Sequence, residues 1–213
     1  MTLKETAIRW IRAQFRHPRG FWGPAVGWIM ASRSSNRRRN VWAVSLLNVG
    51  RHERVLEIGF GPGIAIQAIS RIAIEGYVCG LDHSARMLHQ ASRRNAAAIR
   101  AGRVDLRLGS VESLPVFDAR FDKVLSVNSL MFLTRPDVVL EHLRPLLRAG
   151  GRIAVAQQPR GPGAIEATAS AMGEEIAAAL GRAGFSDVRI ETLRLKPAAV
   201  CAIGVNPPDG GMS

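Results

Sequence analysis

The chain is predicted to fold as an α/β protein with a doubly wound, mostly parallel sheet of seven strands, preceded by a helical extension. From Glu53 onward, short apolar runs alternate with longer amphipathic ones, as strands and helices do in such folds. The last two apolar runs are separated only by residues 194–198, which is too short for a helix. These two runs must therefore pair antiparallel as a C-terminal hairpin.

The elements follow in order from this pattern. The expected strands cover residues 54–58, 77–81, 104–108, 123–127, 152–156, 188–193 and 199–205. The expected helices between them cover residues 64–74, 85–99, 138–147 and 167–183. We therefore expect a helical cap over residues 1–48, one main domain over 49–206 and a flexible tail over 207–213.

The first 48 residues read as helical. Leu3, Ala7, Ile11 and Phe15 recur at steps of four, which predicts an amphipathic helix over residues 2–16. An apolar segment interrupted by glycine and proline follows over residues 21–31. Ser34, Ser35 and Asn36 then offer a cap for a helix that continues to about Leu47.

The charge of the chain is concentrated near its start. The net charge is +12, and residues 1–40 contribute +8 of it, with nine basic residues against Glu5 alone. Such a segment favours an anionic partner, whether a lipid surface, a nucleic acid or an acidic substrate, and a solvated basic face is the alternative. Because charges interrupt it every few residues, it is not a secretory leader. With no apolar run long enough to span a bilayer, we expect a cytoplasmic protein, at most peripheral at a membrane.

The most informative stretch is V-L-E-I-G-F-G-P-G at residues 55–63, a buried strand that ends in a glycine-rich turn opening a helix. In a doubly wound sheet such a turn lies at the carboxyl edge, where ligands bind. Glycine lets a ligand approach the backbone, and the free N–H groups of a helix start favour a negative group. The next strand ends in Asp82, a carboxylate suited to the two hydroxyls of a ribose.

The spacing of the glycines argues against a dinucleotide. The dinucleotide fingerprint needs glycine or alanine where this chain has Ile64, and the third glycine comes one position early, at Gly63. The pattern E-x-G-x-G-x-G, with a second acidic residue after the next strand, instead resembles motifs I and II of class I S-adenosylmethionine (SAM)-dependent methyltransferases. Further segments resemble that family in the same order: G-S-V-E-S-L-P at 109–115, A-R-F-D-K-V at 119–124 and L-R-A-G-G at 147–151.

The resemblance, nearest to the small-molecule enzymes of ubiquinone and menaquinone biosynthesis, implies a Rossmann-like fold and methyl transfer from SAM, with S-adenosylhomocysteine (SAH) as product. It also implies a role for each matching residue. The methionine part would contact Glu57, Gly59, Phe60, Gly61, Gly63 and, at the end of the fourth strand, Asn128; the ribose would contact Asp82; and the adenine would contact Ser110, Val111, His83 and Met87. Met87 could equally be a plain core residue. Two positions depart from the family pattern, since Ser110 stands for a common Asp and Ala149 for a Pro.

The acceptor is expected to meet the N-terminal segment, because no lid is inserted between the fifth and sixth strands. All four tryptophans and two of the seven phenylalanines lie in the first 42 residues, which suggests an apolar pocket wall, a lid or a membrane-facing surface. Helices that merely pack on the sheet are the alternative. The predicted acceptor-binding residues are Trp10, Phe21, Trp22, Trp28, Arg37 and Arg38, with His17 as the candidate proton acceptor. No His, Cys or Asp grouping has metal-ligand spacing, so no metal is expected.

The predicted function is transfer of a methyl group to a small or lipid-like acceptor that can be anionic, and two rivals stay open. A nucleic-acid methyltransferase would explain the basic charge, and N-P-P-D at 206–209 is similar to its N-P-P-Y motif. That motif, however, follows the fourth strand in such enzymes, and the tail here lacks the aromatic residue that stacks on a flipped base. The other rival is a peripheral membrane protein that binds lipid through its first helix without catalysis.

Overall fold

The computed structural model describes residues 34–130, 135–159 and 166–208. The predicted amphipathic helix at 2–16 and the apolar segment at 21–31 lie outside these ranges, and so does His17. The prediction of a separate cap over residues 1–48 therefore stays a prediction.

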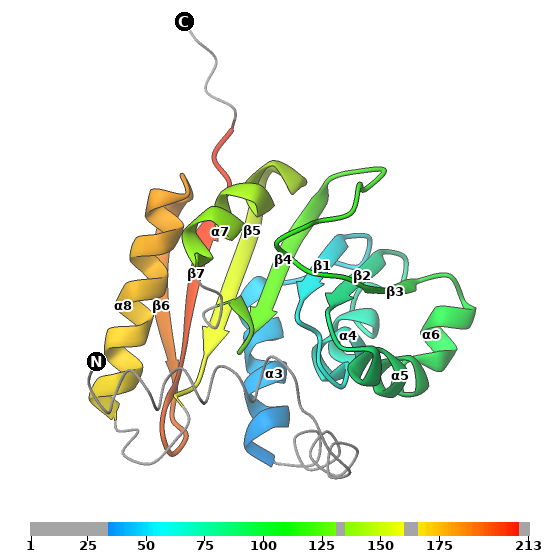
Figure 1. Ribbon diagram of the computed structural model, residues 1–213, viewed down its shortest axis with the longest axis horizontal. Coiled ribbons are helices and arrows are strands. Elements are labelled where there is room, and N and C mark those ends of the chain that lie inside the picture. The colour runs from blue at the N-terminus through cyan, green and yellow to red at the C-terminus, as the bar shows by residue number, and fades with distance from the viewer. Residues whose placement is uncertain (1–33, 131–134, 160–165, 209–213) are drawn as a thin grey trace, which may run out of the picture.

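The described residues form one seven-stranded sheet, as predicted (Figure 1). Its strands are β1 (Arg54–Ile58), β2 (Tyr77–Asp82), β3 (Val104–Leu108), β4 (Phe121–Val127), β5 (Leu147–Gln157), β6 (Ser186–Leu193) and β7 (Ala199–Val205), in the order β3-β2-β1-β4-β5-β7-β6. β7 alone runs opposite to the other six strands, so its pairings with β5 and β6 are antiparallel and the other pairings are parallel. The strand order reverses between β1 and β4, so a ligand is expected at the carboxyl ends of these two strands.

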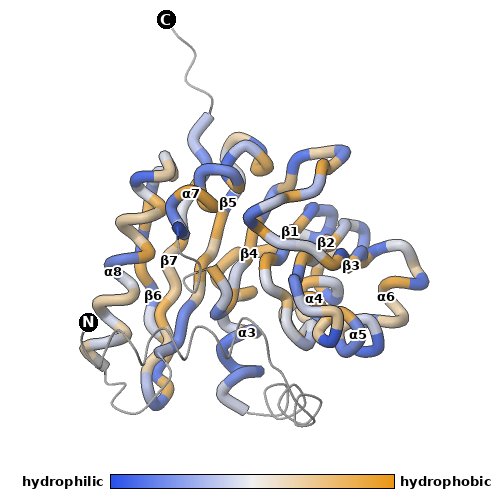
Figure 2. The backbone as a smooth tube through the Cα atoms, in the orientation of Figure 1, coloured by the Kyte–Doolittle hydropathy of each residue, from blue (hydrophilic) through white to orange (hydrophobic). Residues whose placement is uncertain are grey.

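Helices cover both faces of the sheet. They are α3 (Ser34–Leu47), α4 (Ile64–Ser70), α5 (Ala85–Arg94), α6 (Ala96–Arg100), α7 (Pro136–Leu143) with the 3-10 turn η2 (Arg144–Leu146), and α8 (Glu166–Arg182). Figure 1 shows α8 beside β6 and β7, and α4 to α6 beside β1 to β3. Strand residues alternate between the faces: Leu125 and Val127 of β4 pack with α3, α4 and α5, whereas Val124 packs with α7 and α8. In Figure 2 apolar residues follow the strands, while α5 is mostly hydrophilic.

Helix α3, the described part of the predicted cap, belongs to this main core. Ala43, Val44 and Leu47 are buried against the sheet. Arg39, one turn earlier, is only 2% exposed and donates hydrogen bonds to the side-chain oxygens of Gln158, just past β5, and of Asn36. The amino-terminal half of α3 therefore lies at the carboxyl edge of the sheet.

No helix forms between β3 and β4, where every residue is described. Residues 109–120 instead cross the face of the sheet opposite α4 and α5 as an irregular loop. Val111, Leu114 and Phe117 of this loop pack against the cluster that contains Cys79 and Leu81. The loop thus replaces a helix as the cover of β1 and β2 on that face.

Four expected elements differ from the structure by more than two residues. The helix predicted over 64–74 ends at Ser70, because Arg71 and Ile72 leave the helix in a turn. The single helix predicted over 85–99 is two helices, α5 and α6, because the Asn95 amide turns back to donate to the carbonyls of Ala91 and Gly63. The helix predicted to reach Leu147 ends at Leu143 and tightens into η2. Residues 147–151, predicted as a turn, begin β5 with a shift of register against β4.

The start of β5 is held by the residue that follows β7. Gly150 donates its N–H to the carbonyl of Asn206 at 2.8 Å, and the N–H of Asn206 donates to Gly151 at 2.8 Å. The Asn206 amide also donates to the carbonyls of Leu147 and Arg148. Gly150 has a φ of 72°, a conformation that favours glycine.

Of the helices in the described ranges, none combines the length and the apolar character needed to cross a bilayer.

Candidate cofactor site

The glycine-rich turn joins β1 to α4 at the centre of the carboxyl edge. Gly59, Gly61 and Gly63 all have positive φ, at 71°, 51° and 75°. A side chain at Gly59 would overlap the Ser129 hydroxyl, whereas no atom lies within 4 Å of a Cβ placed on Gly61. The turn is therefore packed tightly at its start and open to a ligand at its middle.

Asp82, at the end of β2, is bonded directly to this turn. The N–H of Gly61 donates to Asp82 Oδ2 at 2.8 Å, and the N–H of Ser84 donates to Oδ1 at 2.9 Å. The carboxylate is 6% exposed, and burial raises its pKa while the two backbone donors oppose the rise. The structure thus brings Asp82 together with the residues that the sequence placed beside it, in a fixed orientation.

Glu57 is the second carboxyl group of the site. It is 1% exposed in β1, and its Oε2 has no hydrogen-bond partner. Burial and the negative charge of Asp82 raise the pKa of Glu57 well above the ordinary value, and the Ile66 backbone N–H offsets only part of this. A buried carboxyl with an unused oxygen is suited to a ligand that brings a positive charge or a hydrogen-bond donor.

Asn128 follows β4 in a left-handed conformation, with a φ of 55°. Its Oδ1 accepts the N–H of Gln158 at 2.8 Å, which ties the ends of β4 and β5 together. Its Nδ2 and the Oε1 of the neighbouring Gln157 are both buried without a hydrogen-bond partner. The carboxyl ends of β1, β4 and β5 thus each present one unused polar atom.

The remaining residues assigned by resemblance lie around Asp82 and on the loop after β3. His83 is exposed, with its Nδ1 3.8 Å from Asp82 Oδ1, and Met87 is partly buried against the core on the α4 and α5 face. Ser110 and Val111 are half-buried, and the Ser110 hydroxyl accepts the Glu112 N–H at 3.1 Å. The Gly109 N–H donates to the carbonyl of Asp82 at 2.9 Å, which places the start of this loop beside the β2 end.

Of the residues predicted to contact the acceptor, only Arg37 and Arg38 lie within the described ranges. Trp10, His17, Phe21, Trp22 and Trp28 lie outside the described ranges. Arg37 and Arg38 are exposed on α3, whereas their neighbour Arg39 is buried.

Sequence reasoning missed two residues that support the turn from behind. Arg94 Nε donates to the carbonyl of Pro62 at 2.8 Å, and Asn95 Nδ2 donates to that of Gly63 at 3.2 Å. The one available signal was Asn95 itself, a poor helix former inside a run read as helical.

The fit of SAM can be tested on these residues. The turn offers open space at Gly61, Asp82 presents a carboxylate at a rigid position, and Glu57 keeps an unused oxygen. A nucleoside that carries an amino acid end and a positive charge matches this set. Within the described part of the chain, no three His, Cys, Asp or Glu residues are grouped as metal ligands would be. Fold and site together define a class I SAM-dependent methyltransferase.

Comparison with known proteins agrees with this class. A family described as the methyltransferase domain matches residues 55–151. The chain is 32% identical over 183 residues to YdaC, an uncharacterized methyltransferase of Bacillus subtilis, an alignment that covers 85% of this chain and 98% of YdaC. The chain therefore belongs to the methyltransferase family and is a SAM-dependent enzyme.

Solved structures share the fold at low sequence identity. A SAM-dependent methyltransferase from Aquifex aeolicus has a TM-score of 0.68 at 16% identity, over 85% of this chain and 97% of that one. A phosphoethanolamine N-methyltransferase from Haemonchus contortus, solved with phosphomonomethylethanolamine and SAH, has a TM-score of 0.63 at 17% identity, over 80% and 53%. This likeness extends the fold assignment from the matched family segment to most of the chain.

Asn206, the first residue of the N-P-P-D segment, has a structural role. Asn206 bonds to the start of β5, at the amino edge of the sheet, and the glycine-rich turn lies at the carboxyl edge. The residue that follows β4, where amino-methylating enzymes of nucleic acids carry their motif, is Asn128. The N-P-P-D segment therefore resembles N-P-P-Y in sequence but not in its position in the fold.

Proposed function

We propose that this enzyme methylates a small or lipid-like acceptor that carries an anionic group, and that the residues around the glycine-rich turn bind SAM in the orientation implied by the family motifs. The observation that carries this proposal is the hydrogen bond from Gly61 to Asp82, with the unused oxygen of Glu57 on the adjacent strand. Cytoplasmic location, with membrane contact only through the N-terminal helix, belongs to the same proposal.

Each part of the cofactor has a matching group in this orientation. Asp82 would accept the ribose hydroxyls, because a carboxylate oxygen keeps acceptor capacity after one N–H bond. Glu57 and Asn128 would face the methionine end, and Phe60 would lie with the three glycines along the turn. Ser110 and the Val111 amide would meet the adenine edge, with His83 and Met87 against the ring.

Bound SAM supplies an electrophilic methyl carbon on a sulfonium, and the electrons of the breaking carbon–sulfur bond leave with the sulfur. The nucleophilic atom of the acceptor has to approach in line with that bond, so the protein contributes mainly alignment and exclusion of water. If the nucleophile is a hydroxyl or an amine, its proton must leave, and His17 is the proposed acceptor of that proton.

An anionic acceptor is supported by the position of α3. Arg39 reaches Gln158 at the end of β5, so Arg37 and Arg38, the two residues before it in α3, lie at the same edge of the sheet as the cofactor turn. Both are exposed and can meet a phosphate or carboxylate. The apolar part of the acceptor would contact Trp10, Phe21, Trp22 and Trp28.

Calorimetry with SAM and SAH on the full chain tests the cofactor half of the proposal, and binding of neither would reject it. The acceptor half is tested with methyl-labelled SAM and three probes: a prenylated hydroquinone, phosphoethanolamine and a water-soluble catechol. The R37Q/R38Q variant should raise KM for an anionic acceptor and leave KM for SAM unchanged. A matched change at exposed Arg182, on α8, should alter neither.

A further inference from the structure

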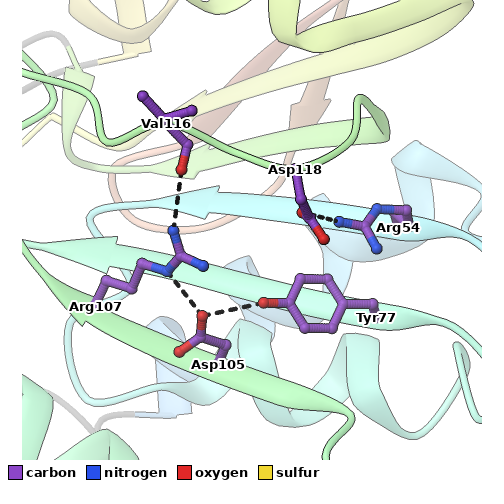
Figure 3. Close-up of polar contacts among 6 residues, drawn as sticks. All are labelled: Arg54, Tyr77, Asp105, Arg107, Val116 and Asp118. Carbon is purple, nitrogen blue, oxygen red and sulfur yellow. Dashed lines mark hydrogen bonds and ion pairs between the residues drawn. The ribbon is translucent and has the colours of Figure 1, made fainter.

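Four side chains of β1, β2 and β3 form a polar cluster, and two of them, Arg54 and Arg107, bind the loop from Gly109 to Arg120 (Figure 3). The Tyr77 hydroxyl donates to Asp105 Oδ2 at 3.0 Å, and Arg107 Nε donates to the same oxygen at 2.8 Å. The guanidinium of Arg54 lies 4.7 Å from the centre of the Tyr77 ring. Asp105 and Tyr77 therefore orient the two arginines, which act on the loop.

The two arginines hold neighbouring positions of the loop. Arg107 Nη1 lies 3.5 Å from the carbonyl oxygen of Val116, and its guanidinium lies 5.3 Å from the centre of the Phe117 ring. Arg54 Nη2 bonds Asp118 Oδ1 at 3.0 Å. Residues 116–118 are thus bound by charge, by a backbone hydrogen bond and by a cation–π contact at once.

The other end of the loop is fixed at the cofactor site. Gly109 donates its N–H to the carbonyl of Asp82 at 2.9 Å, so the loop is anchored both beside Asp82 and at residues 116–118. Ser110 and Val111 lie between these anchors. Because no helix forms between β3 and β4, the far anchor limits how much the intervening segment can move.

We propose that Arg54 and Arg107, oriented by Tyr77 and Asp105, are positioning residues for the adenine of SAM. By holding residues 116–118 they fix Ser110 and the Val111 amide where the adenine edge binds. This inference rests on the adenine role given to Ser110 and Val111 under the proposed function. None of the four side chains of the cluster needs to touch the cofactor.

The test compares two ligands by calorimetry on the full chain. SAH has all three parts of the cofactor, and 5′-methylthioadenosine has the adenine and ribose without the amino acid end. The R107A variant should bind both ligands more weakly by a similar factor of about five, since a loosened adenine segment affects both. R54A should act likewise, and Y77F, which removes only a hydroxyl, should give a smaller loss in the same direction.

Two control variants locate the effect. R103A removes an arginine that donates to the carbonyl of Ser70 at 2.7 Å and holds no part of this loop, so its affinities should equal those of the wild type. E57Q should weaken the binding of SAH and leave the affinity for 5′-methylthioadenosine unchanged, because 5′-methylthioadenosine lacks the amino acid end that is assigned to Glu57. A loss confined to SAH in R107A would overturn the inference.

Amide hydrogen exchange separates positioning from a general loss of stability. In R107A and Y77F, exchange should quicken over residues 110–118, including the N–H groups of Glu112 and Ser113 that bond to Ser110, and stay unchanged in β1 and β4. Faster exchange throughout the sheet would overturn the positioning role. If the wild type binds neither ligand, the proposed function itself fails; if it binds both and R107A matches it, only this inference fails.

Discussion

Arg39 and Gln158 are 119 positions apart in the chain, yet the buried guanidinium of Arg39 donates to the side-chain oxygen of Gln158. Gln158 is itself held by two further bonds, with its N–H donating to Asn128 and its Nε2 donating to the carbonyl of Pro197 at 2.7 Å. Arg39 therefore fastens α3 to the ends of β4, β5 and β7 at the edge where the cofactor turn lies.

Arg39→Met should lower the free energy of unfolding by about 2–4 kcal/mol, because it removes the guanidinium that donates to the buried side-chain oxygens of Gln158 and Asn36, the second of which Asn40 Nδ2 still reaches. Urea denaturation measures this. Arg39→Lys should recover little of the lost stability, because an ammonium cannot reproduce the geometry in which the guanidinium donates to Gln158 through one nitrogen and to Asn36 through another. Arg38→Met, one residue away and exposed, should stay within about 0.5 kcal/mol of the wild type. Equal losses at both positions would contradict the assigned role.

Gly63→Ala should destabilise the protein more than Gly102→Ala, although both glycines have positive φ, at 75° and 69°. A Cβ at Gly63 would lie 2.7 Å from Asn95 Nδ2 and 2.8 Å from the Ala91 side chain, whereas nothing lies within 4 Å at Gly102. Gly102→Ala should lower the free energy of unfolding by about 1 kcal/mol, through backbone strain alone. Gly63→Ala should lower it by about 2–4 kcal/mol, because the overlap adds to that strain. Thermal melting of the ligand-free variants checks the ranking.

The number of strands and their positions along the chain could be predicted from the sequence, because the apolar runs are short and well separated. The turn at 59–63 and Asp82 could be placed together for a similar reason, since the carboxyl ends of adjacent parallel strands meet at one edge. Both features depend on local pattern and on topology, which a single sequence carries.

The polar contacts between distant segments could not be predicted. Among Arg37, Arg38 and Arg39 the sequence gives no reason to choose the buried one, because the choice depends on where Gln158 lies after folding. The break at Asn95 and the early start of β5 depend likewise on the carbonyl of Gly63 and on Asn206. Such partners are set by tertiary packing, which overrides local propensity.

Glu57→Gln should remove a pH dependence from the stability of the ligand-free protein. Burial and the charge of Asp82 raise the pKa of Glu57 above its unfolded value of 4.5, so the folded state holds the proton more tightly. The stabilisation from this group is complete below pH 4.5 and is lost as the pH rises through the folded pKa. The variant should therefore gain stability over the wild type as the pH rises above 4.5, in urea titrations at several pH values. Parallel curves for the two proteins would contradict the raised pKa.

Asp82→Asn should weaken SAH binding by about 10- to 100-fold, as expected for losing hydrogen bonds to a charged group. One carboxylate oxygen becomes an amide nitrogen, so it faces the N–H of either Gly61 or Ser84 as a second donor. The ribose hydroxyls also lose their charged acceptor, and both effects act on the same turn. Calorimetry at fixed pH measures the loss. Glu75→Gln, at an exposed carboxylate that pairs with Arg51 at the opposite edge of the sheet, is the matched control and should leave the affinity unchanged. If the Asp82→Asn protein binds SAH as tightly as the wild type, Asp82 does not contribute to cofactor binding and serves only to bond β2 to the glycine-rich turn.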